Sequence, residues 1–315
     1  NLEIKFRKDD EITTAVKNIS FSVSRGEIVG IVGESGSGKS ATALSIMNLI
    51  PKTSGKVTGG QILFNFESEE TIDLLKLSQK EIRSLRGNFI SMIFQEPMTS
   101  LNPLFTCGYQ VMEAILKHEK CSKKEAKIKT IQLFKQVKLP RPESFFVRYP
   151  HQVSGGQKQR VLIAMAISCH PCIIIADEPT TALDVTVQAT ILKLLKQLQF
   201  EYNMGIIFIS HDLKVIAELA DKVLVLHKGE IVEQGNVADI FLHPKHPYTK
   251  GLLACRPPLN KRVKMLPTLD DFIGLNNEGE EIVLAKVERE TIKANIITKE
   301  ERKNALAKIY TNKPI

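Results

Sequence analysis

The sequence has 315 residues, of which 43% are hydrophobic and 25% are charged, values typical of a folded protein with one large domain or two modest ones. It contains no uninterrupted apolar run of the roughly 20 residues that a membrane-spanning helix needs. Its formal net charge of +8 is scattered among acidic residues, so we expect a solvated surface and no nucleic-acid binding. Five cysteines, an odd number without a secretory signal pattern, favour a reducing compartment.

The N-terminal part is predicted to form strands, then a glycine-rich loop and a helix. Hydrophobic residues alternate over residues 2–6 and again over 19–23, which predicts two strands. The apolar run Ile28–Val32 predicts a third, buried strand. A helix is expected over Lys39–Leu49, ended by Pro51.

Strands and helices then alternate along the chain. We expect strands at Gln61–Phe66, Phe89–Phe94, Cys172–Ala176 and Gly205–Ile209, and a hairpin of Lys222–His227 with Glu230–Glu233. We expect helices at Gly108–Leu139, Val161–Ser168 and Val187–Leu198. This order predicts a mostly parallel sheet covered by helices, with the lysine-rich stretch from Gly108 as an inserted helical layer. Beyond His246 the pattern weakens, and Lys299–Tyr310 is a candidate amphipathic helix.

A phosphate-binding loop is predicted between the third strand and the first helix. The pattern G-x-x-x-x-G-K-[ST] is matched by Gly33, Glu34, Ser35, Gly36, Ser37, Gly38, Lys39 and Ser40, and the helix continues with Ala41. Gly36 and Gly38 let successive backbone N–H groups face the phosphates at a helix N-terminus. Lys39 would reach the β- and γ-phosphates, and Ser40 would offer its hydroxyl to Mg²⁺.

Two adjacent acids end a buried strand further along the chain. We expect Asp177 to hold Mg²⁺, directly or through water, and Glu178 to polarise the attacking water as general base or water-positioning residue. Taken alone, the pair would only end a strand before the turn at Pro179. The phosphate-loop pattern in the same chain favours the catalytic interpretation.

A second serine- and glycine-rich turn precedes a helix-like run. It consists of Ser154, Gly155, Gly156 and Gln157, and it predicts a second anion-binding helix N-terminus. One nucleotide does not need two such loops, so we expect each loop to serve a different face of the chain. In isolation the turn would be an ordinary helix cap formed by Ser154.

Together these motifs resemble the nucleotide-binding domain of ATP-binding cassette (ABC) transporters, over residues from about Leu2 to His246. The resemblance implies that Gln95 is the Q-loop residue contacting Mg²⁺ and the transmembrane partner, that Asp184 belongs to the D-loop, and that His211 is the switch histidine at the γ-phosphate. It also implies an aromatic residue that stacks on adenine. Phe6 is the candidate, although its strand-like alternation fits a core position equally well.

The fold implied by this resemblance is α/β: a P-loop NTPase with a RecA-like core, an N-terminal antiparallel β subdomain, an inserted α-helical subdomain and a C-terminal extension. We expect the ATPase domain at residues 1–245, its helical subdomain at about 97–158, and an oligopeptide-importer-type extension and linker at 246–315. The cofactors implied are ATP and Mg²⁺.

Three segments resemble the ATPases of dipeptide, oligopeptide and nickel importers, namely Ala176–Thr186, His243–Thr249 and Phe94–Pro103. This resemblance implies a peripheral ATPase on the cytoplasmic face of the bacterial cytoplasmic membrane. Its partners would be a second ABC ATPase domain, two transmembrane permease subunits and, indirectly, a solute-binding protein. Relatives in this branch often carry a cysteine cluster in the C-terminal extension. Since only Cys255 lies there, we expect no iron–sulfur cluster.

Other functions stay open from sequence alone. They are an importer ATPase for nickel or another solute, a soluble ABC ATPase acting on ribosomes or in DNA repair, and a nucleotide-gated scaffold without turnover. The presence of Lys39, Gln95, Glu178 and His211 disfavours the scaffold. The segment from Glu300 to the end resembles a linker before a second cassette, and a simple C-terminal helix is its alternative.

Overall fold

The computed structural model describes residues 1–8, 11–66, 71–95, 100–181, 183–255, 273–275 and 281–283. The chain divides into two compact units, Asn1–Val237 and Ala238–Ile315. Every predicted site residue belongs to the first unit.

A six-stranded sheet forms the centre of the first unit, in the strand order β11-β10-β3-β9-β8-β7. Its members are β3 (Ile28–Val32), β7 (Ile90–Ile93), β8 (Ile173–Asp177), β9 (Gly205–Ile209), β10 (Lys222–His227) and β11 (Glu230–Asn236). All neighbours pair in parallel except β10 and β11, which form the predicted hairpin. Apolar runs such as β3 and β9 are buried along their whole length, as expected for parallel strands covered on both faces. The predicted mostly parallel sheet is therefore confirmed.

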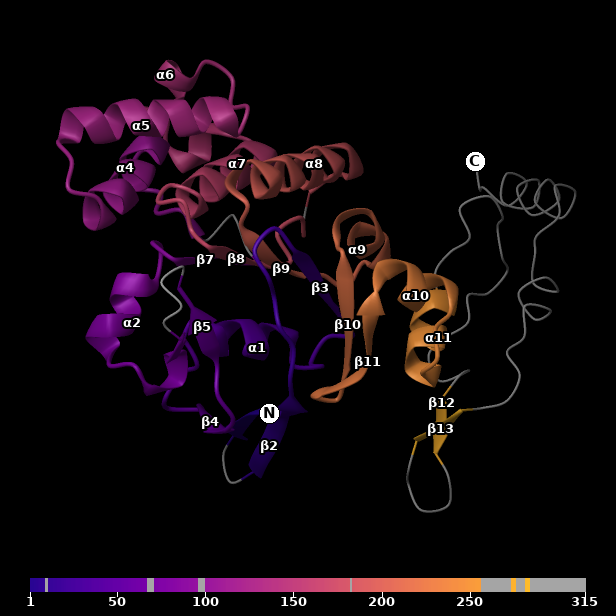
Figure 1. Ribbon diagram of the computed structural model, residues 1–315. Helices are drawn as coiled ribbons and strands as arrows, with labels where there is room; N and C mark the ends of the chain where they lie inside the picture. Colours follow the sequence, from indigo (N-terminus) through magenta and orange to yellow (C-terminus); the bar gives the residue numbers. More distant parts are fainter. Residues whose placement is uncertain are drawn as a thin grey trace, which may run out of the picture. The chain divides into compact units, whose positions relative to one another are not determined.

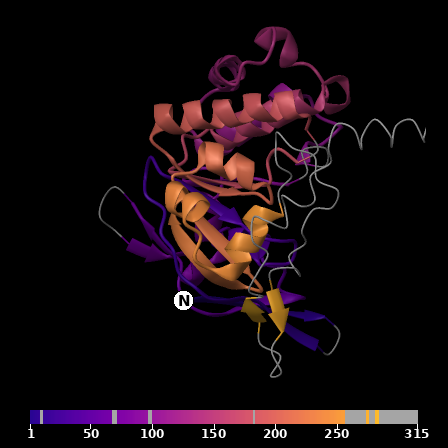
Figure 2. The same cartoon turned by 90° about the vertical axis from the view of Figure 1, so that its right-hand side faces the viewer.

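Helices cover both faces of this sheet. Figure 1 shows α1 (Lys39–Ile46) on one side, and α7 (Gly155–Ala166) and α8 (Val185–Tyr202) on the other. In the turned view of Figure 2, the long helix α8 again lies along one side of the strands. Helix α9 (Leu213–Leu219) packs closely on β3, because a Cβ atom at Gly30 would come within 2.7 Å of the Ile216 side chain.

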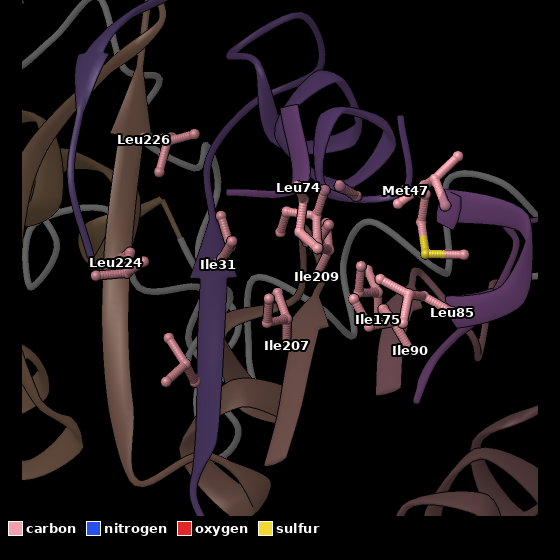
Figure 3. Packing of buried hydrophobic residues seen from close by; sticks show 14 residues of the cluster. Ile31, Met47, Leu74, Leu85, Ile90, Ile175, Ile207, Ile209, Leu224 and Leu226 are labelled. Carbon is pink, nitrogen blue, oxygen red and sulfur yellow. The ribbon is translucent and has the colours of Figure 1, made fainter. Parts of the chain in front are cut away.

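A hydrophobic core fills the space between the sheet and α1. Alternate strand residues point into it, and Figure 3 shows strand residues such as Ile31 and Ile175 together with Met47, Leu74 and Leu85, which come from segments outside the sheet. The core consists of Val29, Ile31, Ala43, Ile46, Met47, Leu74, Ile82, Leu85, Ile90, Ile175, Ile207, Ile209, Leu224 and Leu226. Burying each large aliphatic side chain stabilises the fold by about 1.5–3 kcal/mol. This packing fixes the carboxyl ends of β3 and β8: the phosphate loop follows β3, Asp177 is the last residue of β8, and Glu178 comes directly after it.

A smaller antiparallel sheet, in the order β2-β1-β4, has its own core around Ile4 and Val16. Its strands are β1 (Leu2–Lys8), β2 (Glu11–Ile19) and β4 (Gly55–Gly59). The strand predicted over residues 19–23 is wrong in extent, since β2 ends at Ile19. Phe21 and Val23 instead pack against the cores from an irregular segment. Next along the chain come β5 (Leu63–Asn65), β6 (Thr71–Asp73), η1 (Leu74–Lys76) and α2 (Gln79–Leu85).

A helical layer is inserted between β7 and β8. It comprises α4 (Cys107–His118), α5 (Lys123–Gln136), α6 (Pro142–Phe145) and η2 (Pro150–Gln152). The single helix predicted over Gly108–Leu139 is therefore two helices. The break is set by Ser122, whose hydroxyl accepts from the Glu125 N–H at 3.2 Å while the Glu125 carboxylate accepts from the Ser122 N–H at 2.7 Å. This reciprocal cap starts a new helix.

The second unit contains most of α10 (Val237–Leu242), α11 (Pro247–Ala254) and an antiparallel pair, β12 (Ile273–Leu275) with β13 (Glu281–Val283). Pro247 occupies the first position of α11, where its missing N–H costs nothing. The helix predicted over Lys299–Tyr310 lies outside the described residues. Among the helices that the structure describes, none has both the length and the apolar character required to cross a bilayer.

Candidate functional site

The phosphate loop joins β3 to α1 in a conformation that only glycine adopts without strain. Gly33, Gly36 and Gly38 have φ values of 154°, 82° and 102°. A Cβ atom at Gly33 would lie 2.2 Å from the Leu226 carbonyl oxygen, and one at Gly38 would lie 2.5 Å from the Ala15 carbonyl oxygen. These two positions require glycine for space as well, whereas a Cβ atom at Gly36 would meet nothing within 4 Å.

Lys39 is folded into this loop. Its ammonium Nζ donates to the carbonyl oxygens of Gly33 at 2.8 Å and Glu34 at 2.7 Å, and the residue is 6% exposed. Burial lowers the pKa of Lys39, while the negative charges of Glu178, Asp177 and Glu34 oppose that shift. The bonds to the two carbonyls hold a cation at the point where the loop can receive phosphate oxygens.

Asp177 is a buried carboxylate at the end of β8. It is 5% exposed, and its Oδ1 has no hydrogen-bond partner among the described residues. Burial raises its pKa, and a hydrogen bond from Ser40 opposes that shift. An uncompensated carboxylate oxygen beside a hydroxyl is a donor set that fits Mg²⁺, which prefers hard oxygen ligands. Ser40 and Asp177, two of the residues expected to bind Mg²⁺, therefore suit it.

Glu178 is the meeting point of three segments. Its Oε2 accepts from Gln95 Nε2 at 3.3 Å and from Thr181 Oγ1 at 2.9 Å, and His211 Nδ1 lies 3.0 Å away. An ionised carboxylate can only accept, so the bond to His211 requires a proton on Nδ1. Gln95, Glu178 and His211 follow β7, β8 and β9, which are neighbours in the sheet. Their carboxyl ends meet at one edge, and this topology brings the three side chains together.

These groups face a common cavity of about 400 Å³. Its lining residues are Ala15, Ser35, Gly36, Gly38, Lys39, Ser40, Ala41, Gln95, Glu178 and His211. The structure thus joins part of the predicted phosphate loop to the three predicted catalytic residues. Ala15 was not predicted, because it comes from β2 and no local motif marks it.

Phe6, the candidate for adenine stacking, belongs to the small antiparallel sheet. Its half-buried side chain packs against the core of that sheet, and a Cβ atom at Gly55 would lie 2.7 Å from its ring. Within the described part of the chain, Phe6 is not among the residues lining the cavity. Its role with adenine stays a prediction.

The second glycine turn starts α7, and none of its residues is among the described residues that line the cavity. Ser154 Oγ accepts from the Gln157 N–H at 3.4 Å, and Gln157 Oε1 accepts from the Ser154 N–H at 3.1 Å. A Cβ atom at Gly156 would lie 2.5 Å from Val187 of α8, whereas one at Gly155 would lie 3.5 Å from Leu183. Within this chain, Ser154–Gln157 is therefore a well-capped helix start.

Asp184 of the predicted D-loop caps α8, since its carboxylate accepts from the Val187 N–H at 2.9 Å. It does not line the cavity in the described part of the chain. Ala182 and residues 96–99 of the predicted Q-loop segment lie outside the described residues. Thr181, which contacts Glu178, was not predicted, although its position three residues after the acid is a local signal.

Comparison with known families gives two matches. A family described as "ABC transporter" matches residues 16–181, and one described as "Oligopeptide/dipeptide transporter, C-terminal region" matches residues 232–271. The glutathione import ATP-binding protein GsiA of Shigella boydii serotype 4 (strain Sb227) is 53% identical over 259 residues, and that of Escherichia coli (strain K12) is 52% identical over the same length. Each alignment covers 82% of this chain but 42% of the relative, so the chain spans less than half the length of these relatives.

Solved structures show the same similarity. A dimeric post-hydrolysis state of the ATP-binding cassette MJ0796, bound to ADP and Pi, is 30% identical with a TM-score of 0.66, covering 75% of this chain and 97% of that chain. The structure of cbiO1 from Clostridium perfringens, part of the ABC transporter complex cbiONQ, is 27% identical with a TM-score of 0.63, covering 77% of this chain and 90% of that chain.

Proposed function

This chain belongs to the ABC transporter family, and we propose that it binds and hydrolyses ATP as the motor of a peptide importer. One observation carries the hydrolysis proposal: Lys39, Gln95, Glu178 and His211 converge on a single cavity beside the phosphate loop. If these four side chains only stabilised the fold, a glycine loop of this shape would not be needed beside them.

The loop and Lys39 would bind the phosphates. The backbone N–H groups at the start of α1 favour anions, and the ammonium of Lys39 can exchange its two carbonyl acceptors for phosphate oxygens. We propose that Ser40, Asp177 and Gln95 hold Mg²⁺, which when bound would neutralise charge on the β- and γ-phosphates. The unpartnered Oδ1 of Asp177 supports this assignment.

Glu178 would orient and polarise the attacking water. Its carboxylate lies at the cavity, within hydrogen-bond distance of Gln95 and His211. Gln95 would position the water, and the protonated ring nitrogen of His211 would stabilise the negative charge of the γ-phosphate. A positioned general base typically contributes about a hundredfold to ten-thousandfold to the rate.

We propose that the complete site needs a second cassette. Ser154–Gln157 and Asp184 do not line the cavity of their own chain. Ser154 is nevertheless exposed at the N-terminus of α7, where an anion is favoured. Each nucleotide would therefore lie between the phosphate loop of one cassette and the Ser154 turn of the other. The similar structure of MJ0796 is described as dimeric, which supports this arrangement.

An exposed apolar patch offers a place for the permease subunits. It is formed by Leu104, Phe105, Tyr109, Val147 and Tyr149, with Leu104 79% exposed. The rings of Phe105 and Tyr109 stack at 5.2 Å, and the Cys107 N–H donates to the Arg148 carbonyl at 2.8 Å, so the two segments lie side by side. Large exposed apolar side chains gathered in this way are typical of protein docking surfaces. We propose that a cytoplasmic segment of each permease binds here, with the chain peripheral on that face of the membrane.

The proposed solute is a peptide, supplied by a solute-binding protein. Two findings support it: the match of residues 232–271 to the oligopeptide/dipeptide transporter C-terminal region, and relatives named for import of glutathione, which is itself a tripeptide. We retain the domain assignment of residues 1–245 as the ATPase domain, with a helical subdomain at about 97–158, and of residues 246–315 as the importer-type extension and linker.

The hydrolysis proposal is tested by Glu178→Gln in the full chain. We expect phosphate release from Mg-ATP to fall at least about a hundredfold, because the amide keeps the shape of the side chain but loses the charge that polarises water. ATP affinity should be retained. The matched control is Glu143→Gln, which removes an acid paired with Lys135 on the helical layer. Wild-type turnover in the Glu178→Gln chain would remove this residue from its proposed role.

A further inference from the structure

We infer that Thr181 is a positioning residue that holds the Glu178 carboxylate in its reactive orientation, an inference that rests on the proposed ATPase function. The Thr181 hydroxyl donates to Glu178 Oε2 at 2.9 Å, the shortest of the three bonds to that oxygen. The Glu178 side chain is 13% exposed, so water competes poorly for this bond.

A tight turn brings the two residues together. The Thr181 N–H donates to the Glu178 carbonyl at 3.1 Å, which closes a four-residue turn from Glu178 to Thr181 with Pro179 at its second position. Proline is preorganised for that position. Glu178 itself adopts a left-handed φ of 46°, which is costly for a residue with a side chain. Its N–H donates to the Ile209 carbonyl at 3.0 Å, and this bond anchors the strained residue to the end of β9.

The other two bonds to Oε2 come from segments with separate tasks. Gln95 is expected at Mg²⁺, and His211, whose side chain is 63% exposed, is expected at the γ-phosphate. When these side chains turn toward the nucleotide, they must release Glu178. The Thr181 bond lies within one turn and involves no group that the nucleotide needs. It is therefore the bond that can persist through the reaction, and it leaves Oε1 as the oxygen facing the attacking water.

The test compares two substitutions of one side chain. Thr181→Val keeps the shape and removes the hydroxyl, whereas Thr181→Ser keeps the hydroxyl. A hydrogen bond to a charged group contributes about 1.5–3 kcal/mol. We therefore expect Thr181→Val to lower kcat by about tenfold to a hundredfold, with unchanged KM and unchanged ATP affinity. Thr181→Ser should stay near the wild-type rate. The matched control is Thr190→Val, because Thr190 is exposed on α8 and its hydroxyl donates to the Thr186 carbonyl of the same helix.

A second background separates positioning from general stability. In the Glu178→Gln chain, Thr181→Val should cause no further loss, because the carboxylate that it orients is gone. An equal loss in both backgrounds, or a wild-type kcat for Thr181→Val, would overturn the inference. Neither result would touch the proposed function, which depends on wild-type hydrolysis and its loss in Glu178→Gln alone.

A readout independent of turnover completes the test. In a crystal structure of the wild-type chain with Mg²⁺ and a non-hydrolysable ATP analogue, we expect Thr181 Oγ1 to remain about 3 Å from the Glu178 carboxylate while Gln95 and His211 have moved to the nucleotide. A carboxylate released from Thr181 in that state would contradict the inference.

Discussion

The shape of the phosphate loop can be tested by placing one methyl group at two of its glycines. Gly33 and Gly36 both adopt positive φ, so alanine at either position costs about 1–2 kcal/mol in backbone conformation. They differ in the space around them. A Cβ atom at Gly33 would lie 2.2 Å from the Leu226 carbonyl oxygen and 2.7 Å from Ser37 Oγ, whereas Gly36 is open.

The magnitude follows from that contact. Leu226 belongs to β10, which pairs with β3 up to the residue before Gly33, so the carbonyl cannot move away without disturbing the sheet. Overpacking against such a rigid neighbour typically costs a further 1–3 kcal/mol or so. In a domain of this size, about 1 kcal/mol lowers Tm by roughly 2–4 °C. We expect Gly36→Ala to lower Tm by about 4 °C and Gly33→Ala by about 10 °C.

Thermal and urea unfolding of the two variants give the comparison, and calorimetry with Mg-ATP gives the functional consequence. Gly33→Ala should also weaken ATP binding more than Gly36→Ala, because relief of the clash displaces the loop. Equal losses of stability in Gly33→Ala and Gly36→Ala would refute the reasoning, because the contact with the Leu226 carbonyl would then add nothing to the cost at Gly33.

Two further substitutions test individual side chains at the site. Lys39→Ala should weaken Mg-ATP binding by about 2–4 kcal/mol, or roughly thirtyfold to a thousandfold in Kd, because it deletes the buried ammonium facing the phosphates; unchanged affinity by calorimetry would contradict the phosphate-loop assignment. For Asp177→Asn we expect a higher Tm at pH 7. Burial raises the pKa of the Asp177 carboxyl above its value in the unfolded chain. Ionisation of Asp177 therefore lowers the free energy of unfolding as the pH rises from the unfolded-state pKa to the folded-state pKa, and the uncharged amide avoids this loss. The same variant should lose Mg²⁺-dependent ATP binding, and a lower Tm would show that the carboxylate stabilises the free chain.

The sequence was most informative where function depends on local geometry. The phosphate loop, the two acids at the end of β8 and the cap of α7 each lie within one continuous segment, so their spacing predicts their shape. The apolar runs of β3 and β9 likewise predicted buried parallel strands. Short helices such as α2 and α9 were missed, because seven residues give too little periodicity to distinguish a helix from a loop.

Features that depend on contacts between distant segments could not be predicted from the sequence. Ala15 lines the cavity because strand β2 places the Ala15 carbonyl beside Gly38 of the phosphate loop. The convergence of Gln95, Glu178 and His211 depends on the strand order β9-β8-β7, which no local pattern specifies. Family resemblance named these residues, and the sheet topology supplies the physical reason that they meet. For Phe6 the sequence left two roles open, because its strand-like alternation fitted both a core position and a contact with adenine. Its packing against Gly55 accounts for the core position.

The two-cassette site is tested most directly by mixing two inactive chains. Ser154→Arg should block closure onto the nucleotide of the other cassette, and Lys39→Ala should damage the phosphate loop. A mixed pair then contains one interface with both substitutions and one with neither. We expect the mixture to hydrolyse Mg-ATP although each variant alone does not. A mixture that stays inactive, while the wild-type chain hydrolyses ATP under the same conditions, would contradict a site shared between two copies of this chain.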